Sequence, residues 1–374
     1  MAETSDGVSC PAGPLETFVR GVVRKMGAGA DVAAEVSRHL VRSNLSGHDS
    51  HGVILLPMYV DQADRGELIP AARPAMLRES EVVALVDAGR GFGHFSTMQA
   101  MEWAIARAPR HGVALVAVRH SAHIGRLGEY TERAAGAGLI GIVTVGAGGP
   151  GIGAMLLHGS RVRFFGTNPW SLAVPGVTRA MVYDGATSVM AEGKVRVARA
   201  ARRFLPPECI LDKDGRPSRD PEDLYAGGAL LPLGGTVAGH KGSGLAMASA
   251  LIGALGMIDD PEPTAVGAAT DPTATERAGR VGGLFVQVVD PECFGDAGRY
   301  RALVEEHLAV AKRMPPAAGR EEVLVPGEPE ARARERRVRD GIPLAAATWA
   351  ELGHVAERFG VPLPETRDGR RGTA

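Results

Sequence analysis

The feature that most constrains the fold is a regular alternation of short β-type runs and helical periods between residues 82 and 145. Val82–Val86, Val113–Val118 and Leu139–Val145 are short apolar runs typical of strands, and residues 97–108 and 126–137 carry the apolar period of helices. Such a β-α-β-α-β order packs helices against a sheet. We therefore predict an α/β fold for the middle of the chain.

Helical periods flank this segment on both sides. Toward the N-terminus they cover residues 15–26, the stretch from Asp31 to Val41, and residues 53–65. Toward the C-terminus they cover residues 298–312, 329–340 and 347–359. Between them we expect strands at 170–174 and 281–289 and a buried small-residue helix at 242–257. We therefore expect a helical domain formed by residues 1–78 and 297–374 and a central α/β domain spanning residues 79–296.

Composition excludes several classes of protein. The 374 residues are 45% hydrophobic and 23% charged, which is typical of globular proteins, and the net charge of −1 creates no overall attraction for nucleic acid. Cys10, Cys209 and Cys293 form no C-x-x-C pair, so neither a disulfide framework nor a zinc cluster is expected. No signal peptide and no stretch that spans a bilayer is predicted. We therefore expect a cytoplasmic protein that binds neither nucleic acid nor membrane.

The strongest candidate for chemistry is the segment Gly47-His48-Asp49-Ser50-His51-Gly52, at a junction between helical periods. Glycine on both sides lets the backbone turn and lets a ligand approach. Histidine changes charge near neutral pH and therefore suits proton transfer, and a neighbouring serine can orient its ring. We predict that His51 transfers a proton, whereas His48 fits an ordinary capped turn. No metal site is expected.

Four further polar segments are candidates, and each also has an ordinary structural explanation. His120–Gly128 follows an expected strand and opens a helix, so its N–H groups and Arg126 could hold an anion. Gly166–Pro169 could form a polar wall or a simple turn. Asp184–Ser188 could bind a ribose or cap the next helix. His240–Gly244 would place donors at a helix start, but lacks the residue order of a phosphate-binding loop.

Two other patterns are weaker. Gly146–Gly153 contains a G-x-G-x-x-G spacing, but no helical period follows it, so it predicts a loop near the site and not a Rossmann turn. The arginines between residues 332 and 339 alternate with acidic residues. This is typical of a solvated helix face, with contact to a cofactor phosphate as the alternative.

Together these motifs resemble the malate/L-lactate dehydrogenase-like oxidoreductases. The strings that carry the resemblance are Asp49-Ser50-His51-Gly52-Val53, His123-Ile124-Gly125, Phe165–Pro169, Asp184–Ser188, His240-Lys241-Gly242, and Pro326-Gly327-Glu328 with Gly341-Ile342-Pro343. They agree in order and spacing from about residue 15 to 360, and are most similar to the bacterial hydroxycarboxylate dehydrogenase B branch. The resemblance implies a non-Rossmann central mixed sheet flanked by helices, a helical domain from both chain ends, and a homodimer.

The resemblance also implies hydride transfer between a nicotinamide cofactor and a small 2-hydroxy or 2-oxo carboxylic acid. Carried over by position, His51 is the general acid/base, Ser50 its neighbour in a relay, and His123 the rival acid/base residue, while Thr167 lies near the substrate. The residues implied to contact the cofactor are His51, Gly125, Arg126, Leu127, Asp184, Gly185, Ala186, Thr187, Ser188, His240 and Lys241. The similarity favours NAD, with NADP as the alternative.

Two positions depart from the pattern of the family that the chain resembles. Many members carry an arginine four residues after the catalytic histidine to grip the substrate carboxylate, whereas this chain has Leu55. We therefore expect Arg126 to bind the carboxylate, since a guanidinium suits it, and Leu55 to widen an apolar wall. Imine-reducing members tend to carry Asp at the position of Lys194. Lysine favours a hydroxy acid over the alternative activity, NADPH-dependent reduction of ketimines (cyclic imines or N-alkyl amino acids).

Overall fold

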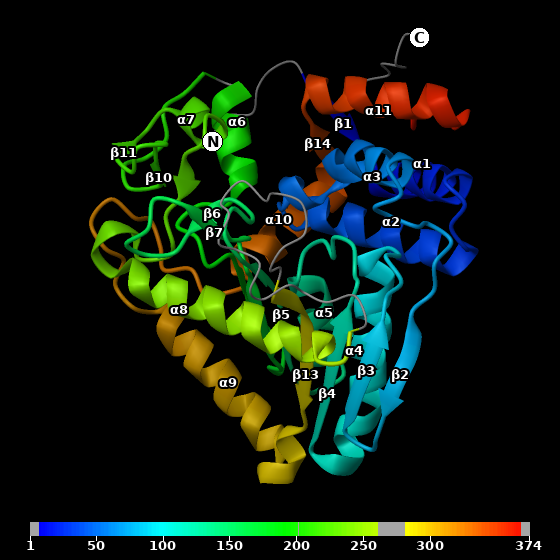
Figure 1. The fold of residues 1–374 in the computed structure, drawn as a ribbon. Helices are drawn as coiled ribbons and strands as arrows, with labels where there is room; N and C mark the ends of the chain where they lie inside the picture. Colours follow the sequence, from blue (N-terminus) through cyan, green and yellow to red (C-terminus); the bar gives the residue numbers. More distant parts are fainter. Residues whose placement is uncertain (1–6, 201, 261–280, 368–374) are drawn as a thin grey trace.

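A mixed β-sheet forms the centre of the molecule (Figure 1). The computed structural model describes residues 7–200, 202–260 and 281–367. The five long neighbouring strands run in the order β5 (Ile140–Gly148), β13 (Val281–Val289), β4 (Val113–Arg119), β3 (Val83–Asp87) and β2 (Ala75–Glu79). Strands β3 and β4 are parallel, whereas β13 is antiparallel to both of its neighbours. The expected mixed sheet and the strand at 281–289 are confirmed.

Helices cover both faces of this sheet. Helices α4 (Gly93–His111) and α5 (Gly128–Gly136) pack on one face, and α8 (Gly235–Gly253) packs on the other (Figure 1). On β5, a side chain at Gly141 would meet Ala134 of α5, and one at Gly146 would meet Ser249 of α8. Alternate residues of a strand point to opposite faces. The predicted β-α-β-α-β order is therefore present, with β13 inserted between β4 and β5.

Short strands extend the sheet beyond β5. They are β7 (Arg163–Phe165), β6 (Met155–Leu156), β12 (Ala229–Leu230), β10 (Ile210–Leu211) and β11 (Pro217–Ser218), in that spatial order. Strand β8 (Trp170–Val174), predicted from the sequence, also pairs with β5 and with β9 (Met181–Gly185). Helices α6 (Glu192–Ala200) and α7 (Pro221–Tyr225) accompany these strands.

The two chain ends meet in a helical layer above the sheet (Figure 1). It contains α1 (Ala12–Lys25), α2 (Ala30–Leu45), α3 (Leu56–Asp64), α10 (Glu328–Asp340) and α11 (Ala346–Phe359). Strand β1 (Val8–Cys10) pairs with β14 (Ile342–Leu344), which ties the N-terminal and C-terminal segments together. The apolar stripe of α1 is buried in this layer, as its helical period predicts.

Three details differ from the sequence analysis. Helix α9 (Ala297–Lys312) contacts the sheet-containing part of the molecule, because its Glu305 accepts a hydrogen bond from Thr178 near β8. The helix expected at 53–65 is a short 3-10 turn, Val53–Leu55, followed by α3 from Leu56. Strand β2 crosses the expected boundary at residue 78. In the described part of the chain, no helix is long and apolar enough to cross a membrane.

Candidate active site

The turn that carries Ser50 and His51 connects α2 to α3. It is a 3-10 turn, Asp49–His51, in which the Ser50 Oγ and His51 Nδ1 atoms lie 3.0 Å apart. Gly52 ends the turn, and a Cβ atom there would lie 2.2 Å from the Asn44 Oδ1 atom. Asn44 in turn accepts the Val53 N–H at 2.9 Å. Glycine is therefore required at this position because the side chain of α2 occupies the space of a Cβ atom.

A second histidine, His123, stacks against His51 from the loop after β4. The two ring centroids are 5.7 Å apart with an interplanar angle of 23°. The His123 Nδ1 atom lies 2.8 Å from the Tyr59 hydroxyl and accepts the Gly125 N–H at 3.3 Å. Tyr59 is also 3.3 Å from His94 Nε2, which lies behind it in the interior. Residues far apart in the sequence thus form one continuous aromatic and imidazole cluster.

These contacts fix which nitrogen of His123 carries the proton. Since the Gly125 N–H points at Nδ1, this nitrogen is an acceptor, and the Tyr59 hydroxyl donates to it as well. In the neutral ring the proton is therefore on Nε2. His51 has the opposite option, because its Nδ1 atom can donate to the Ser50 hydroxyl and leave Nε2 as a base.

The surroundings favour the neutral form of both histidines. Desolvation, followed by the charges of His48 and Arg126, lowers the pKa of His51 from 6.5 to about 4. Desolvation and then His51 lower the pKa of His123 to about 3, although part of the surface of this residue is exposed. Burial also holds the pKa values of His39 and His94 well below 6.5. At neutral pH the cluster is therefore uncharged, as a general base must be before it accepts a proton.

Arg126 is buried in an ion-pair network next to this cluster. Its Nη2 atom lies 2.6 Å from Glu132 Oε1 and its Nε atom 3.6 Å from Asp184 Oδ2. The side chain is 1% exposed, and Asp184 also accepts the Gly128 N–H at 2.7 Å. Burial raises the pKa of Asp184, against the opposing effect of Arg126. A role as carboxylate clamp, as expected from the sequence, would require Arg126 to leave these partners.

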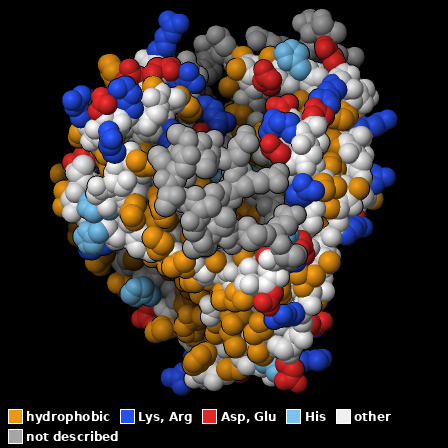
Figure 2. Space-filling view, viewed as in Figure 1, with side chains coloured by type: hydrophobic (Ala, Val, Ile, Leu, Met, Phe, Trp, Pro, Cys, Tyr) orange, Lys and Arg blue, Asp and Glu red, His pale blue; other side chains and the backbone are white. Residues whose placement is uncertain are grey.

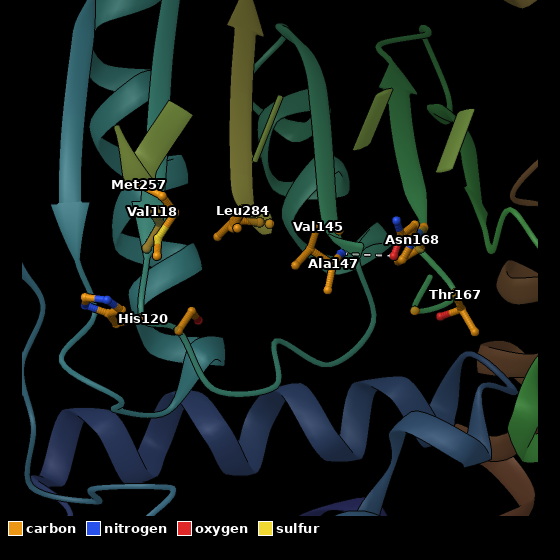
Figure 3. Close-up of a pocket in the computed structure, with 14 residues that line it drawn as sticks. Val118, His120, Val145, Ala147, Thr167, Asn168, Met257 and Leu284 are labelled. Carbon is orange, nitrogen blue, oxygen red and sulfur yellow. Dashed lines mark hydrogen bonds between the residues drawn. The ribbon is translucent and has the colours of Figure 1, made fainter. Parts of the chain in front are cut away.

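A cavity of about 420 Å³ opens between the ends of β4, β13 and β5 (Figure 3). His120 lies on one side, and Thr167 and Asn168 lie on the other; Val118 and Leu284 are among the apolar residues between them, and Ser121 follows His120 in the lining. The remaining lining residues are Val145, Gly146, Ala147, Gly166, Pro169, Met257, Gly282 and Gly283. The glycine-rich segment thus begins inside β5, and its first residue reaches the site. Ser121 enters the cavity on the same loop that brings His123 to His51.

This cavity suits the flat, amide-bearing ring of a nicotinamide. Its volume lies within the ~300–1,000 Å³ of small-molecule sites, and its walls are mostly apolar with a few polar groups. The Asn168 side chain accepts the Ala147 N–H at 3.1 Å and donates to the Ala246 carbonyl at 2.8 Å, so the wall is rigid (Figure 3). Ser121 and Thr167 remain at the cavity as hydroxyl groups for an amide or a ribose.

Among the other predicted cofactor residues, the segment from Asp184 to Ser188 contacts the wall of the cavity through Thr187. Asp184 and Gly185 end β9, and Thr187 donates to the carbonyl groups of Thr167 and Asn168 at 3.0 and 3.2 Å. The remaining members of this segment are Ala186, which is half-buried, and Ser188, which donates to the Met190 carbonyl. This segment therefore supports the wall that presents Thr167.

His240 and Lys241 are both exposed on α8. This helix begins at Gly235, earlier than expected, and is interrupted at Ala238 (φ −128°), so the two residues follow the break closely. The prediction that they open the helix is wrong in its boundary, because the sequence of small residues gave no sign of the additional turn. His240 and Lys241 do stand near the start of the unbroken part of α8, which follows Ala238.

Leu55 and Lys194, the two positions that depart from the family pattern, lie in different surroundings. Leu55 is 7% exposed and packs in the apolar core of the helical layer. Lys194 is exposed near the start of α6, and its neighbour Gly193 is so close to Ser50 that a Cβ atom would lie 2.7 Å from the serine Cβ. Lys194 therefore adjoins Gly193, which closely approaches Ser50, whereas Leu55 is part of the apolar core.

Several residues of the site were not found from the sequence. Tyr59 and His39 look like ordinary members of helical periods and His94 precedes one, and only the fold places them behind His123. The buried amide of Asn168 was part of a recognised turn, but its link to β5 could not be seen. Among the described residues, no group of three or more His, Cys, Asp or Glu side chains is arranged to hold a metal ion.

The sequence and the fold are similar to those of known dehydrogenases. The family profile described as malate/L-lactate dehydrogenase matches residues 11–353. Hydroxycarboxylate dehydrogenase B from Escherichia coli is 34% identical over 351 residues, which cover 93% of each chain. The solved structure of sulfolactate dehydrogenase from Methanocaldococcus jannaschii is 31% identical, with a TM-score of 0.80 over 94% of this chain and 98% of that chain. The fold is thus the mixed α/β architecture of these dehydrogenases, and the chain belongs to the malate/L-lactate dehydrogenase family.

A relative with a different printed activity also matches. The Delta(1)-pyrroline-2-carboxylate/Delta(1)-piperideine-2-carboxylate reductase from Pseudomonas putida is 31% identical over 366 residues, which cover 96% of this chain and 98% of that protein. The similarity in length and identity means that family membership by itself does not separate the reduction of an oxo acid from the reduction of an imine. The choice between these activities depends on the site.

Proposed function

We propose that this chain is an oxidoreductase that transfers a hydride between a nicotinamide cofactor and a small 2-hydroxy or 2-oxo carboxylic acid. The observation that carries this proposal is the stacked His51–His123 pair, 5.7 Å between centroids, in which His123 comes from the loop whose residues His120 and Ser121 line the cavity. Oxidation of an alcohol needs a base for the hydroxyl proton and a donor that holds the same oxygen. A pair of neutral imidazoles with opposite proton positions supplies both.

In the direction of oxidation, His51 acts as the base. Its Nδ1–H donates to the Ser50 hydroxyl, and its free Nε2 accepts the proton of the substrate hydroxyl. His123, held by Tyr59, donates its Nε2–H to the same substrate oxygen. The bound nicotinamide supplies the hydride acceptor. In the direction of reduction, protonated His51 returns the proton to the oxygen.

The cofactor and substrate residues are part of the proposal. Thr167 and Ser121 would hold polar groups at the cavity, and the segment from Gly125 to Leu127 would border the cofactor. Contacts from Asp184 to Ser188 and from His240 and Lys241 complete the expected set. Arg126 would then act mainly through Asp184 and the Gly128 N–H, because these contacts hold the start of α5. We propose NAD as the cofactor, with NADP as the alternative.

We also propose a cytoplasmic homodimer. Figure 2 shows hydrophobic side chains gathered over the lower ends of β13 and β4 and between α8 and α9. Leu251 on α8 and Leu303 on α9 are 57% and 62% exposed. Large exposed apolar patches are typical of protein interfaces. The three cysteines, all unpaired, are consistent with a reducing compartment.

The test is an absorbance assay with NADH and NADPH, each supplied separately with pyruvate, oxaloacetate, phenylpyruvate or 2-oxoglutarate, with and without methylamine. Oxidation of the reduced cofactor by a 2-oxo acid without amine is the expected result. Turnover that requires methylamine would overturn the proposal in favour of ketimine reduction, the activity of the Pseudomonas relative. The same assay decides between NAD and NADP.

A further inference from the structure

Side chains of helix α10 bind the segment that precedes the proposed catalytic pair Ser50–His51. Three contacts join them: His48 Nε2 to Glu330 Oε1 at 3.2 Å, Arg334 Nη2 to Ser46 Oγ at 3.0 Å, and Arg337 to Asp49. Residues 330, 334 and 337 are spaced i, i+4 and i+7, so they lie on one face of the helix. This face therefore contacts residues 46–49 just before the catalytic pair.

The strongest of these contacts is a two-pronged ion pair. Arg337 donates from Nη1 to Asp49 Oδ1 at 2.7 Å and from Nη2 to Asp49 Oδ2 at 2.9 Å. The same guanidinium donates to the Asn44 carbonyl at the end of α2. Its side chain is only 12% exposed. Such a bidentate pair fixes the orientation of a carboxylate as well as its position.

Asp49 transmits this orientation to the catalytic turn. Its Oδ1 atom also accepts from Asn44 Nδ2 at 2.6 Å, and Asn44 holds the Val53 N–H on the far side of the turn. The Asp49 carbonyl accepts the Gly52 N–H at 3.1 Å. Asp49, Asn44 and Arg337 therefore form a hydrogen-bonded frame that holds the backbone on both sides of Ser50 and His51.

We infer that Arg337 is a positioning residue for the reaction: from the C-terminal helix α10, it sets the place of the Ser50–His51 pair by clamping Asp49. The inference rests on the proposed function for its catalytic meaning. It also gives the arginine-rich segment a third role, distinct from a solvated face and from a contact with a cofactor phosphate.

Neighbouring arginines of α10 provide the contrast. Arg332 pairs with Glu322 and Glu328, and Arg339 pairs with the adjacent Asp340. Arg336 is exposed and has no hydrogen bond or ion pair to residues 46–53 in the described structure. It lies on the same helix, one residue from Arg337, and is therefore the matched control.

The first test measures kcat and KM for Arg337→Ala, Arg337→Lys and Arg336→Ala. Misplacing a catalytic group by about 1 Å can cost on the order of 100-fold. We expect kcat to fall about 10- to 100-fold in Arg337→Ala, with Arg337→Lys intermediate because it keeps the charge and loses the fork. Arg336→Ala should match the wild type. Asp49→Asn should add little to Arg337→Ala, because the pair is already broken.

The second test measures the effect of Arg337 on His51 without any catalytic turnover. NMR titration of the His51 ring in substrate-free protein reports the pKa of this residue. In the wild type, His48 and Arg126 help to lower this pKa, and the His123 ring stacks on that of His51. Removing Arg337 leaves the Asp49 carboxylate unpaired two residues away, so the pKa of His51 should rise in Arg337→Ala and stay unchanged in Arg336→Ala.

The outcomes are distinguishable. The inference is overturned if a folded Arg337→Ala variant keeps both the wild-type kcat and the wild-type His51 titration, or if Arg336→Ala shows the same losses. If Arg337→Ala does not fold, Arg337→Lys with wild-type kcat and titration overturns it equally. If the wild-type protein reduces no 2-oxo acid, the proposed function fails while the titration still tests the frame.

Discussion

Two polar clusters share the loop from His123 to Gly128, and they are built in opposite ways. One consists of His51, His123, Tyr59, His94 and His39, which lie in ring contact with one another and are neutral at physiological pH. The other is a network of full charges, with Arg126, Glu132 and Asp184 at its centre. They meet where the Arg126 N–H donates to His39 Nε2 at 2.9 Å.

The difference teaches how the fold divides its work. Burial of an unpaired charge is costly, so the imidazole cluster stays neutral and available as a base. In the charged cluster the opposite charges compensate one another, so their ion pairs can hold the loop from His123 to Gly128 and the start of α5 in place. The positive charge of Arg126 also helps to lower the pKa of His51 across the boundary. We therefore propose that the charged cluster holds the loop from His123 to Gly128 in place and that the neutral cluster performs the proton transfer.

The largest effect should come from breaking the neutral cluster at its centre. His51→Gln removes the base and should lower kcat by ~10²–10⁴-fold, as is usual for a lost general acid/base. Steady-state kinetics with a 2-oxo acid measures it, and circular dichroism checks the fold. A His51→Gln enzyme with wild-type kcat would show that the pair does not act as proposed.

The next largest effect should come from the charged cluster. Arg126→Met leaves Glu132 and Asp184 buried with less positive charge, and removing one partner of a buried pair costs about 3–5 kcal/mol in the free energy of unfolding. Urea unfolding measures this loss. The KM for the 2-oxo acid separates the two roles: a lower stability with unchanged KM indicates a structural role, whereas a large rise in KM would restore Arg126 as a carboxylate clamp.

Acid should act selectively on the neutral cluster. The pKa of His51 is about 4 in the folded protein and 6.5 without the fold, so the unfolded chain binds more protons between these values. The stability that the neutral ring contributes is therefore complete above pH ~6.5 and is lost as the pH falls toward ~4. Urea unfolding at several pH values should show a shallower loss in His51→Gln than in wild type. The exposed residue His354 is the control, and His354→Gln should leave the slope unchanged.

The smallest effect should come from Tyr59→Phe. This change removes the hydroxyl that donates to His123 Nδ1 at 2.8 Å and lies 3.3 Å from His94 Nε2, while the Gly125 N–H remains. The net loss of one such hydrogen bond is about 1 kcal/mol. We expect a loss of about 1–2 kcal/mol in the free energy of unfolding and a modest fall in kcat, measured on the same sample. A gain in stability would contradict the assigned direction of this hydrogen bond.

The sequence was informative where a pattern is local. The alternation of strands and helices from residue 82 to 145 predicted β3, α4, β4, α5 and β5, because period and length are properties of single segments. The terminal helices followed for the same reason. The glycine-flanked string from Gly47 to Gly52 predicted the turn on which the structure places Ser50 and His51.

What could not be predicted depends on long-range contacts. The insertion of β13 between β4 and β5 joins segments more than a hundred residues apart, and no local pattern encodes it. Arg337 and Asp49 are separated by 288 residues, so the arginine-rich segment looked like a solvated face. Arg126 suggested a free anion donor because its two carboxylate partners come from α5 and from β9.

The most direct test of the central claim is the pH dependence of kcat/KM for oxidation of the hydroxy acid that proves to be the substrate. The account predicts an acid limb governed by His51, near pH ~4 and well below that of an ordinary histidine, which His51→Gln abolishes along with most of the activity. A limb near pH ~6.5, or one that survives in His51→Gln and disappears in His123→Gln, would contradict the account and make His123 the base.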